Sequence, residues 1–366
     1  MINKLVIENL KHRWVRTLLS ELVVGVQVMS ILTLIGLSRG LLQDSANRAK
    51  GTGADIVLQP DTKQGTISFA SGQVKQSFVP FVAKQPHVRQ AVGVLTQSVE
   101  LITSMNGVNF DEFQKISGGL RFLSGGPPQG PDDLIVDEAY ARQNRLQVGQ
   151  TVKLLNHNWH LVGIVQGGML ARFIVPLTTL QDLTSNTQRI SQILVKLDDP
   201  SLADREVAEF NRQLKGNLRA ISMADLVSLF NINNIPQLKA FIAVITVLAV
   251  VVGFLVVFLS MYTAVVERTR EIGILKALGA KPFTIIDILV REAVVLALVG
   301  CILGIVLAVV AKGVILAIAP ASLPVTDAPD WWPIAAAIAL GGALLGAIYP
   351  GLKAARQDAI EALSYE

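Results

Sequence analysis

The sequence has little of the chemistry on which many enzymes and disulfide-bonded domains depend. Its 366 residues include a single cysteine, Cys301, so no disulfide can form within the chain. The sequence also contains no HExxH metal motif and no GxxxxGKS/T phosphate loop. We therefore expect no catalytic site, no metal site and no resident cofactor in this polypeptide.

Charge and clustered metal ligands are also scarce. Charged residues make up 16% of the chain and the formal net charge is +4, so a nucleic-acid partner is not expected. His157 and His160 lie close together, but no cysteine or carboxylate accompanies them at a spacing typical of zinc sites. The acidic pairs at 132–133 and 198–199 stand beside prolines, as turn residues often do.

Hydrophobic residues, in contrast, make up 51% of the chain, and the mean hydropathy is +0.49. This composition is too apolar for an average soluble protein. Four stretches carry no charged residue, namely 22–38, 240–266, 293–311 and 331–352. Each approaches or exceeds the roughly 20 residues that a helix needs to cross about 30 Å of hydrocarbon. The sequence therefore predicts four transmembrane helices.

Basic residues predict the orientation of these helices, because loops rich in Lys and Arg stay on the cytoplasmic side. Such residues stand before the first span, between the second and third spans, and after the fourth. They are Lys4, Lys11, Arg13, Arg16, Arg268, Arg270, Lys276, Lys281, Lys353 and Arg356. The short segment 320–330 has none. We expect both termini to be cytoplasmic and the long domain between the first two spans to be external.

The N-terminus allows further interpretations. A basic start followed by an apolar stretch also begins a secretory signal, but this run is long and no clear small-residue cleavage site ends it. Ile2, Leu5 and Leu10 fall broadly on one helical face, as in an interfacial helix that lies on the membrane. A plain cytoplasmic tail fits the same residues.

The stretch 43–236 has the composition of a folded domain outside the bilayer. Runs of β-prone residues alternate with turn residues at 54–58, 92–94, 134–136, 151–155, 161–165, 173–175 and 193–197. Segments 137–146 and 203–214 have helical composition, and GGPPQGP at 125–131 is a loop. The predicted fold is an α-helical membrane protein with four transmembrane helices and a large α+β extracytoplasmic domain between helices 1 and 2.

The segment after the second hydrophobic run has the clearest functional pattern. ERTREIGILKALGAKP, residues 267–282, places Ile272, Leu275 and Leu278 so that they can face the bilayer or neighbouring helices. Gly279 and Pro282 then end the helix. A short charged helix held between two membrane helices can dock on a cytosolic partner and convert its movement into helix movement. A solvated loop with stop-transfer charges remains the alternative.

The stretch ERTREIGILKALGA resembles the signature of the FtsX-like and MacB-like (type VII) ABC transporter permease family, in which this loop contacts the ATPase. Segments 9–10 and 16–19 are similar to the family's entry into the first span. Segments similar to the MacB-type periplasmic domain and to the family's closing motif are 136–139, 146–152, 161–165, 195–200, 349–350, 354–355 and 360–363. The predicted order of one span, an outer domain and three spans is also the family's.

The resemblance implies a division of the chain and a coupling site. The implied segments are 1–42 (interfacial helix and first span), 43–236 (MacB-type domain), 237–266 (second span), 267–284 (cytoplasmic coupling loop), 285–319 (third span), 320–330 (external loop), 331–352 (fourth span) and 353–366 (cytoplasmic C-terminal helix). The residues implied to couple to the ATPase are Glu267, Arg268, Arg270, Glu271, Gly273, Lys276 and Gly279.

Two glycine pairs have the GxxxG spacing that lets membrane helices approach closely, although the same spacing arises by chance in glycine-rich spans. They are Gly300 with Gly304 and Gly342 with Gly346. We expect these glycines to pack the third and fourth spans against other helices.

The resemblance also implies a function and partners. The expected function is that of an inner-membrane ABC permease subunit, which is not itself an enzyme and transmits the motion of a separate ATPase. That ATPase would bind ATP and Mg, and it is expected on another polypeptide because the nucleotide-binding domain fused in MacB is not found here. Further expected partners are a second permease copy or paralogue, membrane lipids, a periplasmic adaptor and an outer-membrane channel.

The substrate class is left open between a lipid, a lipoprotein, a peptide and a drug-like molecule. The alternative function is a mechanotransmission scaffold that transports nothing and regulates an extracytoplasmic hydrolase or sensor. A third class, an ion-coupled carrier, is disfavoured because the spans hold few ionisable residues at mid-depth.

Overall fold

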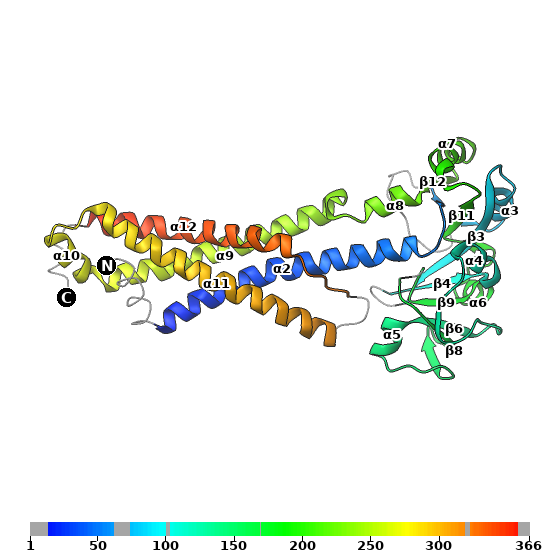
Figure 1. Cartoon of the computed structure of the whole chain (residues 1–366), viewed down its shortest axis with the longest axis horizontal. Coiled ribbons are helices and arrows are strands. Elements are labelled where there is room, and N and C mark those ends of the chain that lie inside the picture. Colours follow the sequence, from blue (N-terminus) through cyan, green and yellow to red (C-terminus); the bar gives the residue numbers. More distant parts are fainter. Residues whose placement is uncertain (1–13, 62–73, 100–102, 169, 319–322, 358–366) are drawn as a thin grey trace. The chain divides into compact units, whose positions relative to one another are not determined.

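The computed structural model describes residues 14–61, 74–99, 103–168, 170–318 and 323–357. Within these residues the chain forms two compact units (Figure 1). The first, called the helical unit, contains the described residues up to Arg39, Pro236–Ile318, and those from Val325 onward. The second, called the sheet unit, is centred on Gly40–Ile235. The predicted interfacial helix before residue 14 lies outside the described residues.

Long apolar helices make up the helical unit. They are α2 (Trp14–Lys50), α9 (Pro236–Glu267), α11 (Pro282–Ile318) and α12 (Trp332–Arg356), with the short α10 (Thr269–Ala277) between α9 and α11 and the 3-10 turn η3 (Pro329–Trp331) before α12. Each long helix contains one of the four charge-free stretches and is apolar enough to span a membrane. This confirms the predicted class of membrane protein with four transmembrane helices.

The long helices extend beyond the hydrocarbon thickness. The 37 residues of α2 and of α11 each measure about 55 Å at a rise of about 1.5 Å per residue. Hydrocarbon offers no hydrogen-bond partner, so a spanning segment satisfies its own backbone as a helix. α2 is unbroken, and its residues from Gly40 to Lys50 belong to the sheet unit.

The last long helix, α12, continues through Pro350 and ends at Arg356. The sequence predicted a cytoplasmic C-terminal helix from residue 353, but residues 353–356 are the last residues of α12. The remainder of that segment, residues 358–366, lies outside the described residues.

Glycines let α11 approach α2 closely. A Cβ atom placed on Gly304 would lie 2.6 Å from Cβ of Val28, and one placed on Gly300 would lie 2.7 Å from Cβ of Val24. Both distances are shorter than real side chains tolerate. The backbones of these two helices are thus in close contact at Gly300 and Gly304, and a larger residue at either position would push the helices apart.

The second glycine pair contacts α9. A Cβ atom on Gly346 would lie 3.0 Å from the carbonyl oxygen of Phe254, which is tighter than ordinary packing. A Cβ atom on Gly342 would meet Val250 only at 3.9 Å, an ordinary van der Waals distance. Gly346 is therefore the closer contact point between α12 and α9.

A mixed ten-stranded sheet forms the centre of the sheet unit in the described part of the chain, in the order β12-β1-β11-β3-β4-β9-β6-β8-β5, with β7 paired to β8. The strands are β1 (Ile56–Pro60), β3 (Val88–Ser98), β4 (Ser104–Val108), β5 (Phe122–Gly125), β6 (Asp133–Asp137), β7 (Thr151–Leu154), β8 (His157–Val165), β9 (Phe173–Pro176), β11 (Gln192–Leu197) and β12 (Leu218–Ser222). A separate pair joins β2 (Val74–Lys75) and β10 (Arg189–Ile190).

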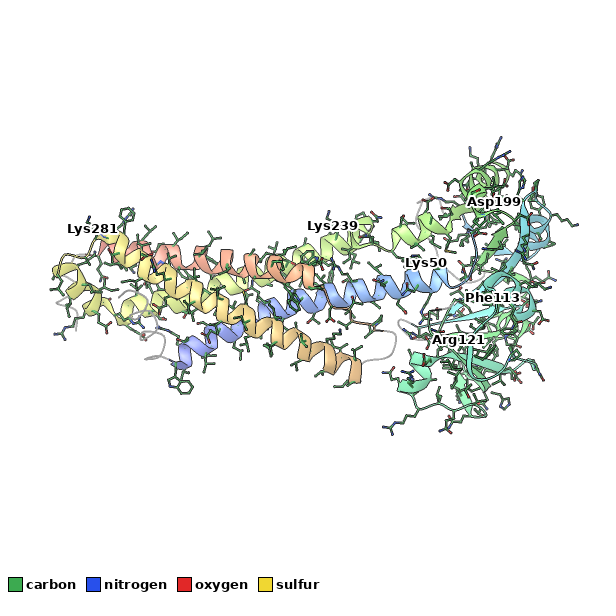
Figure 2. The ribbon with its side chains drawn as sticks, in the orientation of Figure 1. Lys50, Phe113, Arg121, Asp199, Lys239 and Lys281 are labelled. Carbon is green, nitrogen blue, oxygen red and sulfur yellow. The ribbon has the colours of Figure 1, made fainter. Side chains whose placement is uncertain are left out.

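Helices cover both faces of this sheet. They are α3 (Phe78–Ala83), α4 (Phe110–Ser117), α5 (Glu138–Gln143), α6 (Leu177–Leu183), α7 (Ala203–Gln213) and α8 (Met223–Leu229), with the 3-10 turns η1 (Pro200–Leu202) and η2 (Ile232–Asn234). Side chains alternate along each strand, so Ile56 and Leu58 enter one core and Val57 enters the other. The first core includes Phe210 of α7. The second includes Phe113 of α4, which is labelled in Figure 2.

All seven predicted strand segments overlap strands of the structure. The predicted helix 137–146 overlaps α5, and the predicted helix 203–214 overlaps α7. The mixed α+β character of the domain between the first two spans is thereby confirmed. The sequence did not predict β4, β12 or the short helices α3, α4, α6 and α8. Strand β4, which reads SMNGV, lacks the run of β-branched residues that marked its neighbours.

A buried charge network holds the end of α2 on the sheet. Asp137, at the end of β6, is 1% exposed and accepts hydrogen bonds from Arg48 at 2.8 Å and from Arg172 at 3.1 Å. Asp44 contacts the same two arginines, at 2.9 and 3.4 Å. Burial, aided by the neighbouring Arg48, lowers the pKa of Arg172 below its ordinary value. Two positive and two negative charges therefore balance within this group, called the charge quartet.

Candidate coupling site

The segment singled out by the sequence folds as a short helix with defined ends. α9 ends at Glu267, Arg268 leaves helical geometry, and α10 follows from Thr269. At the other end, Gly279 has a φ of 94° and Ala280 donates its amide to the carbonyl of Leu275 at 3.0 Å. This is a Schellman cap, in which glycine takes the left-handed conformation at little cost. The turn to α11 follows at Lys281 (Figure 2).

Ionic contacts fix the beginning of α10. Arg268 is buried and its Nη1 lies 3.5 Å from Oε2 of Glu292 in α11, a carboxylate that is only 1% exposed. The preceding residue, Glu267, accepts a hydrogen bond at 3.0 Å from Arg16 of α2. Because buried charges are costly unless paired, these contacts specify where α10 starts relative to its neighbours.

The end of α10 is fixed to the last long helix. Lys276 donates its ammonium to the carbonyl of Ala355 at 2.7 Å and also to the carbonyl of Gln357. These carbonyls belong to the final turn of α12, where no further helical amide is available to bond them. A cation at this position also complements the negative end of the helix dipole. The segment 267–277 is thus joined to α2, α11 and α12 by specific contacts.

The opposite surface of α10 faces away from the helical unit. Arg270, Glu271 and Ile274 are exposed on α10 itself. Leu278 and Phe283, on either side of the Gly279 turn, are 81% and 82% exposed, the highest values among the large apolar side chains that the structure describes. This surface thus carries charged side chains in the first turn of α10 and two protruding apolar side chains beside its end, a combination found in docking surfaces.

The residues that the sequence suggested for coupling fall into two groups. Glu267, Arg270, Glu271 and Gly279 are exposed. In contrast, Arg268 and Gly273 are buried, and Lys276 is half-buried against α12. Arg268 and Lys276 hold the helix in place through their contacts with Glu292 and with the end of α12.

Sequence reasoning missed some parts of the site. Glu292 is not part of the segment that the sequence singled out, and only the fold shows that it pairs with Arg268. Phe283 follows Pro282 in the sequence and had no charged pattern to mark it. Leu278 was grouped with the packing side chains Ile272 and Leu275, but it lies at the helix cap and is exposed.

Other groups of potentially reactive residues have ordinary structural roles. His157 pairs with Asp132 at 2.8 Å on the surface of the sheet unit. No cluster of three or more metal-binding side chains occurs among the residues that the structure describes. Gly36, Ser38 and Gly40 have the GxSxG spacing of serine hydrolases, but they lie within continuous α2, where that motif's sharp strand-to-helix turn is not formed.

Two family models match the chain. The model of the MacB-like periplasmic core domain matches residues 17–213, which is more than half of the chain. The model of the FtsX-like permease C-terminal region matches residues 243–359 and includes α10 with the three long helices around it.

Curated relatives show the same pattern. The chain is 26% identical over 325 residues to a macrolide export ATP-binding/permease protein MacB from Aggregatibacter actinomycetemcomitans, which covers 80% of this chain and 50% of the relative. It is 24% identical over 403 residues to MacB from Escherichia coli, which covers 99% of this chain and 60% of the relative. The chain therefore spans about half to three fifths of the length of these relatives.

A solved structure of the periplasmic region of MacB from Actinobacillus actinomycetemcomitans aligns with 48% of this chain and 92% of that one, at 17% identity and a TM-score of 0.39. The assignment rests on the family models, which together cover both the sheet unit and the three helices that follow it. The chain belongs to the FtsX-like and MacB-like permease family.

Proposed function

We propose that this chain is the permease subunit of an ABC transporter and that α10 is the element through which an ATPase drives it. The family provides the transporter context. The observation that supports the coupling role is that α10 and the two residues before it make specific contacts to α2, α11 and α12, while charged and apolar side chains of the same segment are exposed.

A coupling element needs both properties. A partner can move helices only if the surface it touches is rigidly connected to them. In this chain the connections are the Arg268–Glu292 pair and the two bonds from Lys276 to the end of α12. The exposed Leu278 and Phe283 supply apolar contact area, and Arg270 and Glu271 supply charges that select the partner.

The proposed partner is a cytoplasmic ABC ATPase that binds ATP and Mg. This requires α10 and both termini to be on the cytoplasmic side, in agreement with the Lys and Arg pattern of the flanking segments. We propose that two permease copies or paralogues pair above two ATPase domains, so that ATP binding pushes the two α10 elements together. Movement of α2 would then reach the sheet unit, because α2 is one unbroken helix whose last residues lie in that unit.

We propose that the substrate is a lipid, lipoprotein, peptide or drug-like molecule handled outside the bilayer. The curated relatives are named as macrolide exporters, and this chain spans only part of their length. A periplasmic adaptor and an outer-membrane channel would complete an export route.

A second function uses the same movement without transport. The continuity of α2 favours a mechanotransmission scaffold equally well, because a rigid helix relays motion whether or not a substrate is moved. Co-purification distinguishes the two functions. An adaptor or channel protein recovered with the chain supports export, and a hydrolase or sensor recovered with it supports signalling.

The coupling proposal is tested with charge reversals on the exposed surface. The chain is purified with the ATPase that accompanies it, and ATP hydrolysis is measured after reconstitution. Arg270→Glu and Glu271→Lys should leave the protein inserted and folded but lower ATP hydrolysis by the complex several-fold. Arg205→Glu, an exposed position on α7 of the sheet unit, makes the same charge change as a control. Hydrolysis that is unchanged in both α10 variants would contradict the proposal.

A further inference from the structure

The sheet unit contains a cavity that the coupling mechanism does not use. Its volume is about 200 Å³, and it lies between one face of the sheet and the segments that cover it, namely the last turns of α2 and the helix α8. Strands β1, β11, β3 and β4, which are adjacent in the sheet, form its floor. A space of this size holds a group larger than a few water molecules.

The floor of the cavity is polar where the surrounding face is apolar. The alternation of side chains places Val92 and Val94 of β3 in the core on this face. Further along the same face, Thr96 of β3 lies directly opposite Asn106 of β4 in the strand register. Ser104 and Gln192 also line the cavity. Thr96, Ser104 and Gln192 are half-buried at this end of the face, whereas Asn106 is buried. A buried polar residue costs free energy unless it is hydrogen-bonded, so Asn106 is the unusual member of this set.

Two of the lining residues have buried polar atoms without a hydrogen-bond partner. Arg48 uses Nε and Nη2 in the charge quartet, and its Nη1 is buried and unpaired. Asn106 is 4% exposed, and its Oδ1 is likewise buried and unpaired. Leaving such atoms unsatisfied costs free energy, and most buried polar groups in folded proteins have partners. The residues that line the cavity thus include one unpaired donor atom and one unpaired acceptor atom, both of them buried.

These two atoms define the chemistry of a matching ligand. The donor on Arg48 needs an oxygen acceptor, and the acceptor on Asn106 needs an N–H or O–H donor. A carboxylate supplies acceptors only, and the charge of Arg48 is already balanced by Asp44 and Asp137. A carboxamide has a carbonyl beside an N–H and so offers one partner of each kind.

The rest of the ligand would be apolar. Met223, Leu226 and Phe230, from α8 and its C-terminal end, line the side of the cavity that faces the sheet floor. Leu194, on β11 of the floor itself, and Leu170 add further apolar surface. These side chains offer a surface for a short hydrocarbon group, whose burial contributes about 25 cal/mol per Å² of apolar area.

We propose that this cavity binds an amphipathic molecule through an amide group and a short apolar group attached to it. The amide carbonyl accepts from Nη1 of Arg48, and the amide N–H donates to Oδ1 of Asn106. Both a peptide backbone and an N-acyl lipid carry this combination. The site is independent of the proposed coupling function, because it lies wholly within the sheet unit and its occupancy needs no ATPase.

The test uses small soluble probes with the full chain in lipid nanodiscs and empty nanodiscs as the blank. Saturation-transfer NMR titrations measure the binding of three compounds. Hexanamide represents an N-acyl group, N-acetyl-leucinamide represents a peptide, and hexanoate is the matching carboxylate that lacks a hydrogen-bond donor. Saturable binding of at least one amide, with Kd of about 1 mM, and at least tenfold weaker binding of hexanoate would support the proposal. The amide that binds more tightly indicates whether the natural ligand supplies its amide from an acyl chain or from a peptide.

Variants assign the binding to this cavity. Asn106→Leu removes the acceptor and should weaken amide binding about tenfold. Ala49→Leu, which fills the cavity from α2, should abolish it. Met105→Leu changes the opposite face of β4 and should leave binding as in the wild type, which controls for disturbance of the strand. Absence of saturable amide binding, hexanoate binding equal to that of the amides, or equal binding by Asn106→Leu and wild type would overturn the proposal.

Discussion

Arg268 pairs with Glu292 at 3.5 Å across the junction of α9, α10 and α11, and both side chains are almost completely removed from solvent. Burying two charges costs several kcal/mol for each ion, and their attraction offsets this only when the geometry is good. Such a pair contributes less to stability than an apolar pair of the same size, and its main effect is to fix position. In this chain the fixed position is the start of α10, on which the proposed coupling depends.

Removing one partner of this pair should destabilise the helical unit more than replacing both partners. Glu292→Gln leaves Arg268 buried without its counter-charge and should destabilise the helical unit by about 3–5 kcal/mol. The double variant Arg268→Met with Glu292→Leu removes both charges and should recover most of that loss. Thermal unfolding of the detergent-solubilised protein measures both effects. A double variant less stable than Glu292→Gln would show that the pair stabilises the fold directly.

The same double variant separates stability from coupling. If the ion pair positions α10, stability should return while ATP hydrolysis by the complex remains below that of the wild type. Recovery of both quantities together would mean that apolar packing positions α10 as well as the ion pair does.

Gly304→Val should separate α11 from α2. A Cβ atom on Gly304 already lies 2.6 Å from Cβ of Val28, so a branched side chain cannot fit without moving a helix. The expected loss is at least about 2 kcal/mol, within the range for overpacked cores. Gly313→Val in the same helix is the matched control, because no atom lies within 4 Å of a Cβ placed there. The midpoints of thermal unfolding should fall for the first variant only, and equal midpoints would contradict close packing at Gly304.

The sequence predicted those parts of the fold that a regular pattern encodes. Charge-free stretches located the four long helices, because hydrocarbon excludes charges and forces backbone bonds to close within the helix. Runs of β-branched residues located β1, β3 and β11 for a similar reason, since those strands are buried on both faces. Gly279 predicted the end of α10 because the left-handed cap favours glycine.

The parts that the sequence did not predict depend on contacts between distant residues. Strand β4 was missed because Ser104 and Asn106 take inward positions that apolar residues fill elsewhere on this face. No local sequence feature identifies the partners of Glu292 and Lys276, which lie 24 and 79 residues away along the chain. The charge quartet likewise joins α2 to the end of β6 and to Arg172, the residue before β9, only after the sheet has formed.

Asp137→Asn should destabilise the sheet unit strongly. The carboxylate of Asp137 balances Arg48 and Arg172 and also accepts from the amide of Tyr140 at 2.8 Å, capping α5. Its neutralisation leaves two buried guanidinium groups with only Asp44 for balance, at an expected cost of about 3–5 kcal/mol. Limited proteolysis of the sheet unit under increasing urea measures the loss. Asp182→Asn, an exposed position in α6, should change resistance by less than about 0.5 kcal/mol.

The orientation of the chain can be measured with single cysteines, because Cys301 is the only native thiol and Cys301→Ser removes it. Arg270→Cys places a thiol on the exposed surface of α10, and Lys215→Cys places one in the exposed turn after α7 in the sheet unit. Basic residues flank the α10 segment and are absent from 320–330, so α10 should be cytoplasmic and the sheet unit external.

A membrane-impermeant maleimide applied to cells whose outer envelope has been opened should therefore label Lys215→Cys at once. It should label Arg270→Cys only after the inner membrane is made permeable. Labelling of Arg270→Cys in sealed cells would place α10 on the external side, out of reach of any ATP-driven partner. The same result would remove the reason for expecting the charge reversals at Arg270 and Glu271 to act on ATP hydrolysis, because the surface they alter would then face a compartment without ATP.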